Sequence, residues 1–95
     1  MPASSHPVSA TATICNRRGL HARAAARLAK LAEEFAAEIN VKSKGLSVSA
    51  RSIMGLMLLA AGPGTEVEIE ATGRKAKEAV AAVVALIESR FDEDV

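Results

Sequence analysis

Aromatic side chains are scarce in this 95-residue chain, which has no tryptophan, no tyrosine and two phenylalanines. Aliphatic and small residues must therefore fill the core, which suits helices that pack closely on a sheet. A sheet without exposed aromatic residues lacks the surfaces on which bases of single-stranded RNA stack. The carboxylates of Glu66, Glu68 and Glu70 would also repel phosphates, so we expect no nucleic acid as a partner.

Excess charge and paired cysteines are missing as well. Twelve basic and eleven acidic residues leave a net charge of +1, so electrostatic attraction to a partner must be local. The single cysteine, Cys15, cannot form an internal disulfide, and the N-terminus lacks the basic-then-apolar pattern of a secretory signal. We therefore expect a cytoplasmic protein. No His and Cys residues have the spacing of metal ligands, so neither a metal nor a cofactor is expected.

Long apolar stretches are absent, and the longest, at residues 53–61, is too short to cross a bilayer, so no membrane contact is expected. A chain of this length forms one domain with a modest core and no cofactor-sized cavity. We place the domain at residues 8–91. The polar, proline-containing tail at 1–7 includes His6, which we expect to be idle, and residues 92–95 are expected to be a C-terminal tail.

Alternation of apolar and polar residues predicts four strands. The first is residues 8–15, and the clearest is "TEVEIEA" at 65–71, where the glutamates alternate with Val67, Ile69 and Ala71. Gly45 marks a hairpin between the other two strands. The residues expected to face inward on the first three strands are Val8, Ala10, Ala12, Ile14, Ala37, Ile39, Val41, Leu46, Val48 and Ala50.

Apolar residues at helical spacing predict three helices. The first starts at Ala22, a short one lies between Ser52 and the Gly-Pro-Gly at 62–64, and a long one follows Gly73. The expected buried stripes are Ala24, Leu28, Leu31 and Phe35 in the first helix, and Ala76, Val80, Val83, Ile87 and Phe91 in the last. The order βαββαβα predicts an α/β (α+β) fold, an open-faced β-sandwich with a four-stranded, mostly antiparallel sheet and helices packed on one face.

His21 lies between the loop 16–20 and the first turn of the first helix. The unpaired N–H groups there and the helix dipole favour an anion. Together with Arg17, Arg18 and Arg23 they disfavour the imidazolium form, so a neutral imidazole could attack phosphorus. The same donors and a guanidinium would then hold the phosphoryl group. Alternatively, His21 is only a polar residue near a helix cap, and no carboxylate is clearly placed to orient it, which argues against a conventional hydrolase.

Ser52 heads the short helix, where a serine stabilises the helix end without any other duty. The apolar residues after it exceed what one buried stripe needs, so we expect Leu56 and Leu59 in the core and part of the rest exposed for docking. The alternative is that the whole run is core. A phosphate on Ser52 would place negative charge beside this surface.

Two motifs together resemble the family of the histidine-containing phosphocarrier protein HPr, of the bacterial phosphoenolpyruvate-dependent phosphotransferase system. These are "GLHARAAARL" at 19–28 and "RSIMGLM" at 51–57, and the likeness runs from residue 8 to about 91. The resemblance implies that His21 accepts a phosphoryl group on Nδ1 from phosphorylated enzyme I and passes it to an enzyme IIA protein. It implies a monomeric carrier rather than an enzyme. Ser52 matches the serine that HPr kinase/phosphorylase phosphorylates in many bacteria.

Matching the family residue by residue assigns further roles. The phosphate-binding positions would be Asn16, Ala22, Arg23 and Ala24, and the docking positions Leu20, Arg23, Ala24, Arg27, Ile53, Met54 and Met57. Ala24 replaces the proline of many members, which adds an N–H and removes a fixed φ. The ending "LLAAGPG" favours the nitrogen-related branch over sugar uptake. The alternative function is a regulatory protein-binding module that acts through residues 52–57 without phosphotransfer.

Overall fold

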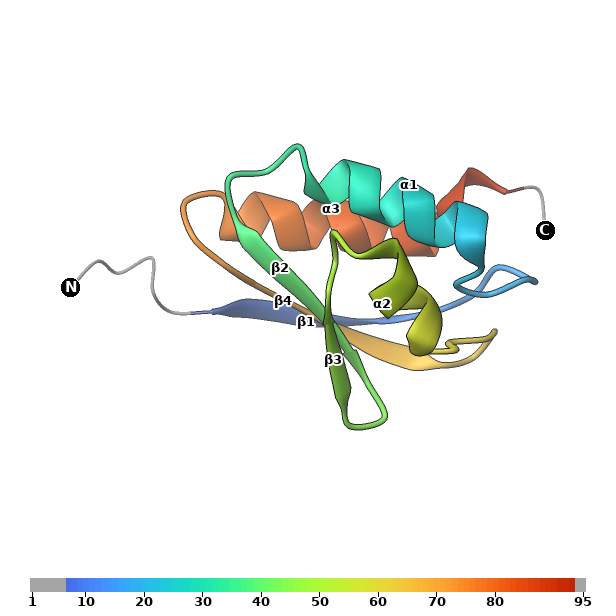
Figure 1. Ribbon diagram of the computed structural model, residues 1–95. Coiled ribbons are helices and arrows are strands. Elements are labelled where there is room, and N and C mark those ends of the chain that lie inside the picture. The colour runs from blue at the N-terminus through green and yellow to red at the C-terminus, as the bar shows by residue number, and fades with distance from the viewer. Residues whose placement is uncertain (1–6, 94–95) are drawn as a thin grey trace.

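The computed structural model describes residues 7–93, so His6 and most of the expected N-terminal tail lie outside it, as do residues 94 and 95. Its elements follow the expected order (Figure 1). The strands are β1 (Val8–Thr13), β2 (Glu38–Ser43), β3 (Leu46–Ser49) and β4 (Glu66–Thr72). The helices are α1 (Ala22–Ala32), α2 (Ile53–Leu58) and α3 (Ala76–Glu88), followed by a short turn, η2 (Arg90–Asp92).

The four strands form one antiparallel sheet in the order β1-β4-β2-β3. Helices α1 and α3 lie side by side over one face of this sheet, and the other face is open (Figure 1). On β4, Val67, Ile69 and Ala71 are buried under the helices, as the alternation predicted. On the open face, Glu68 pairs in register with Thr11 of β1 and Lys42 of β2. The open-faced α+β sandwich is therefore confirmed.

Strands β1 and β3 are shorter than predicted, and β3 ends at Ser49, before Ala50. Strand β1 ends at Thr13, because the chain at Ile14 instead pairs with the segment before β4, donating to Thr65 O at 2.9 Å and accepting from Gly64 N at 2.7 Å. The prediction that Leu46 faces the core is wrong, since Leu46 is exposed at the tip of the hairpin. The turn itself uses Lys44 and Gly45, which both have positive φ.

The expected helical stripes extend beyond the helices that the structure forms. Helix α1 ends at Ala32, so Phe35 reaches the core edge from the following loop, where it is half-buried. Helix α3 ends at Glu88, and Phe91 is fully buried although it lies in η2. Phe35 and Phe91 therefore reach the core although each lies beyond the end of its helix.

The turn η2 has a left-handed backbone. Arg90, Phe91 and Asp92 have φ values of 61°, 55° and 60°, a conformation that costs roughly 1–2 kcal/mol for each non-glycine residue. Burial of Phe91 and a hydrogen bond from the Arg27 guanidinium to its carbonyl oxygen hold the turn in place. Residues 92 and 93, expected to belong to a tail, are therefore held against the domain.

Arg51 connects the start of α2 to the end of α1. One nitrogen of its guanidinium lies 3.1 Å from Ala32 O, 3.0 Å from Phe35 O and 2.9 Å from Ala37 O. Ala32 is the last residue of α1, where a positive charge also complements the helix dipole. Arg51 therefore caps α1 from outside the helix.

We predict that Arg51→Met lowers the free energy of unfolding by about 1–2 kcal/mol, because it removes charge-assisted hydrogen bonds but keeps an apolar stem. Urea denaturation measures the change. The matched control is Arg74→Met at an exposed loop position, for which we expect a change within about 0.5 kcal/mol. Equal stability of the two variants would show that the carbonyl contacts of Arg51 contribute nothing.

Candidate functional site

The loop 16–20, which leads to His21, is pressed against the segment that follows α2. Gly19 has φ +66°, and a Cβ added there would lie 2.5 Å from Ala61 O. Only glycine fits this backbone conformation and this close approach. The next residue, Leu20, donates its N–H to the same Ala61 oxygen at 2.9 Å. The loop is therefore fixed to the segment after α2, just beyond the second motif.

His21 is the N-cap residue of α1. Its backbone is extended, and its carbonyl accepts the first helical hydrogen bond, from Ala25 N, at 2.8 Å. Its side chain makes no capping hydrogen bond within the described residues. The N–H groups of Ala22, Arg23 and Ala24 belong to the first turn and have no partner inside the helix. An anion beside His21 would meet these donors and the positive end of the helix dipole.

Glu93 supplies a carboxylate to this site. One carboxylate oxygen, Oε2, contacts His21 Nε2, and the other, Oε1, accepts a hydrogen bond from Asn16 Nδ2 at 3.0 Å. Asn16 Nδ2 also donates to Gly19 O at 2.8 Å. The side chains of His21 and Glu93 are only 14% and 12% exposed, so water screens their contact little. The expectation that no carboxylate orients His21 is therefore corrected.

Electrostatics keep Glu93 ionised. Burial by itself would raise the pKa of Glu93, but hydrogen bonds from Asn16 and His21, together with the positive charges of His21 and Arg18, lower the pKa overall. An ionised carboxylate can only accept hydrogen bonds. The His21 nitrogen that faces it, Nε2, therefore carries a proton. In the neutral imidazole, the other nitrogen, Nδ1, then has the free lone pair.

The other predicted site residues divide by exposure. The exposed ones are Arg17, Arg18, Ala22, Arg23 and Arg27. The Arg27 guanidinium nevertheless donates a hydrogen bond to Phe91 O.

Asn16, Leu20 and Ala24 are buried, so the side chains of Leu20 and Ala24, which we expected to contact partners, are not accessible to them. Asn16 uses its amide hydrogens on Gly19 and Glu93, and its Oδ1 has no hydrogen-bond partner among residues 7–93.

Ser52 is confirmed as the N-cap of α2, where its Oγ accepts a hydrogen bond from Gly55 N at 3.0 Å. Leu56 and Leu59 are buried, as predicted. The remaining apolar side chains form an exposed surface, in which Met54 is 75% and Leu58 71% exposed. We call this surface the α2 patch, and its members are Ile53, Met54, Met57 and Leu58. Leu58 was not among the predicted docking residues.

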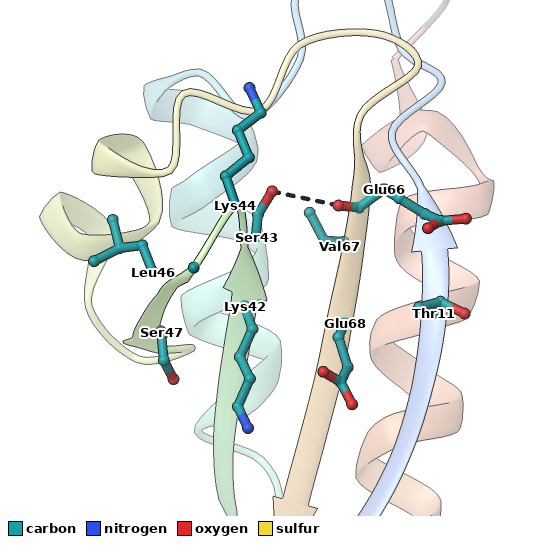
Figure 2. A pocket seen from close by; sticks show the side chains of 10 residues that line it. Thr11, Lys42, Ser43, Lys44, Leu46, Ser47, Glu66, Val67 and Glu68 are labelled. Atoms are coloured by element: carbon teal, nitrogen blue, oxygen red, sulfur yellow. Dashed lines mark hydrogen bonds between the residues drawn. The ribbon is translucent and has the colours of Figure 1, made fainter.

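The open face of the sheet carries a separate hollow of about 530 Å³ at the β2–β3 hairpin (Figure 2). Lysine and glutamate side chains line it, and Ser43 Oγ donates to the backbone oxygen of Glu66 at 3.3 Å. It shares no residue with the His21 site or with the α2 patch. The hollow is open to solvent rather than enclosed.

Over residues 7–93, no three His, Cys, Asp or Glu side chains gather as they would around a metal ion. No helix in that part of the chain has the length and apolar character needed to cross a membrane. Cys15 has a free, exposed thiol that donates to Ile87 O at 3.4 Å.

A histidine that precedes the first turn of a helix lies where the helix N–H groups can bind a phosphoryl group. Comparison with protein families agrees with it: the profile described as "PTS HPr component phosphorylation site" matches residues 8–89. The chain therefore belongs to the HPr family of phosphocarrier proteins of the phosphotransferase system.

Curated relatives include both branches of this family. The chain is 48% identical to phosphocarrier protein HPr of Cupriavidus necator over 81 residues, which cover 85% of this chain and 91% of that protein. It is 42% identical to phosphocarrier protein NPr of Escherichia coli K12 over 88 residues, which cover 92% and 98%. The family assignment thus spans nearly the whole chain.

Solved structures show the same fold. HPr-C-His from Thermoanaerobacter tengcongensis is 41% identical, with a TM-score of 0.88 over 93% of this chain and 99% of that one. An HPr dimer from the same organism is 44% identical, with a TM-score of 0.73 over 84% and 92%.

We predict that Glu93→Gln changes how stability depends on pH. The folded pKa of Glu93 lies below the usual value of 4.5, so its stabilising contribution is present above pH 4.5 and is lost as the pH falls through the folded pKa. Urea unfolding of wild type and variant between pH 7 and pH 3 should show a gap that closes on acidification. The control is Asp92→Asn, which removes a neighbouring exposed carboxylate. A gap of constant size would contradict the prediction.

Proposed function

We propose that this chain accepts a phosphoryl group on Nδ1 of His21 from phosphorylated enzyme I and passes it to an enzyme IIA protein. The observation that carries the proposal is the position of His21, which begins α1 beside unpaired N–H groups while its other nitrogen, Nε2, is occupied by Glu93. No enclosed pocket is needed, because the group moves between two proteins.

The first turn of α1 supplies the proposed phosphate-binding groups. The N–H groups of Ala22, Arg23 and Ala24 would donate to phosphoryl oxygens, and the exposed Arg23 guanidinium would neutralise their charge. Because residue 24 is alanine, its N–H adds a donor that proline would lack. Asn16, which we expected to bind phosphate, is assigned instead to holding the loop and Glu93, since both are partners of its amide.

Partners are proposed to dock on the α2 patch together with Arg23 and Arg27. This surface lies near His21, because the hydrogen bond from Leu20 to Ala61 ties the end of the α2 segment to the loop. Phosphorylation of Ser52 by a kinase of the HPr kinase/phosphorylase type would add charge beside the patch and weaken docking. We propose that the carrier works as a cytoplasmic monomer, in sugar uptake or in nitrogen and carbon regulation.

The test is the intact mass of the protein after incubation with phosphoenolpyruvate, Mg²⁺ and enzyme I, before and after brief acid treatment. We expect a gain of one phosphoryl group that acid removes, since phosphohistidine is acid-labile. His21→Ala should acquire none, whereas His6→Ala, which changes the only other histidine, should behave as wild type. Equal labelling of His21→Ala would show that the carrier residue lies elsewhere.

A second candidate, a regulatory binding module, rests on the exposure of the α2 patch. Met54→Asp should raise the concentration of enzyme I at which phosphoryl transfer is half-maximal, because it places a charge in an apolar contact. Arg74→Asp, at an exposed position outside the patch, is the control. If Met54→Asp abolished a regulatory effect in cells that His21→Ala left intact, the binding module would be the better description.

A further inference from the structure

We propose that Glu93 is a positioning residue for phosphoryl transfer: by accepting the Nε2 proton, its carboxylate fixes the His21 ring and leaves the lone pair on Nδ1. This inference rests on the proposed role of His21. It is carried by the contact between Glu93 Oε2 and His21 Nε2, in which the carboxylate can only accept. The opposite tautomer would set two acceptors against each other.

The carboxylate is itself held from two sides. Asn16, fully buried, donates to Glu93 Oε1, so the two oxygens of the carboxylate have different partners. The backbone before Glu93 is anchored by the buried Phe91 ring and by Arg27, which donates to Phe91 O. Side chain and backbone are therefore both fixed, which is what a group needs if it is to orient another.

The left-handed turn at η2 supports the same role. Three successive non-glycine residues adopt positive φ there, which local preference disfavours. Such a conformation persists only where surrounding contacts determine it, and it gathers at functional sites. The turn brings the end of the chain back from α3 to the start of α1 and so delivers Glu93 to His21.

His21 loses no proton during the transfer step. The Nδ1 lone pair forms the new N–P bond while the bond between phosphorus and the donor protein breaks, and its electron pair returns to the donor. The Nε2 proton stays on the ring and remains hydrogen-bonded to Glu93. The phosphoryl oxygens carry negative charge and accept hydrogen bonds from the N–H groups at the start of α1. Glu93 stays on the other side of the ring, at Nε2.

The first readout is NMR of the His21 ring in ¹⁵N-labelled protein, at a pH where the imidazole is neutral. We expect the wild-type proton on Nε2, protected from exchange with water. Glu93→Ala should lose this protection and mix the tautomers, whereas Glu93→Gln, which keeps an acceptor oxygen, should restore much of it. Asp92→Asn is the charge control, and His6→Ala assigns the ring signals. The measurement does not depend on phosphorylation.

The second readout is single-turnover phosphoryl transfer from phosphorylated enzyme I, measured against enzyme I concentration. Outer partners that fix the tautomer of a metal-binding histidine contribute about 10-fold to 100-fold, and we expect Glu93→Ala to lower the maximal rate constant by a factor in this range. The half-saturating concentration should not change. Glu93→Gln should recover most of the rate, and Asp92→Asn should match wild type.

Several results would overturn the inference: an unchanged ring proton and rate in Glu93→Ala, or a change in the half-saturating concentration alone. Amide spectra of each variant verify the fold. If wild type accepts no phosphoryl group, the proposed function fails, while the NMR comparison still decides whether Glu93 fixes the ring. If His21 is required but Glu93→Ala transfers normally, only the positioning role fails.

Discussion

The close contact between Gly19 and Ala61 is the constraint on which the site depends. The loop can approach the segment after α2 only because residue 19 has no side chain and adopts positive φ. Leu20 then donates to Ala61 O, and His21 becomes the N-cap residue of α1. One backbone contact thus places the proposed phosphorylation site beside the exposed α2 patch, although about thirty residues separate the two motifs. Substrate exchange between proteins needs such a fixed, shared surface more than it needs a cavity.

The two nitrogens of His21 occupy different electrostatic surroundings. Nε2 meets an ionised carboxylate held by Asn16, while the start of α1 offers unpaired N–H groups to whatever joins the ring at Nδ1. The Glu93 carboxylate keeps the neutral ring in one tautomer. The N–H groups and the helix dipole at the start of α1 would stabilise the negative charge of the phosphoryl group. In this arrangement Arg23 remains exposed and free to neutralise the product.

Local patterns predicted the fold and part of the site, because they depend on near neighbours in sequence. The alternation in β4, the helix start at Ala22 and the N-cap at Ser52 were all readable in this way. Glu93 was not, since it lies 72 residues from His21 and reaches it through a left-handed turn that no local pattern encodes. The only hint was Phe91, whose helical spacing indicated burial near the chain end. Leu46 was misplaced because alternation does not show where a hairpin leaves the core.

The most direct test is to identify which ring nitrogen carries phosphorus. Protein labelled with ¹⁵N in histidine and phosphorylated by enzyme I would be examined for one-bond ¹⁵N–³¹P coupling in the His21 ring. We expect the coupling at Nδ1, with a proton still attached to Nε2, because Glu93 holds that nitrogen as a donor. Coupling at Nε2 would contradict the account, since the phosphoryl group would then occupy the position that the structure gives to Glu93.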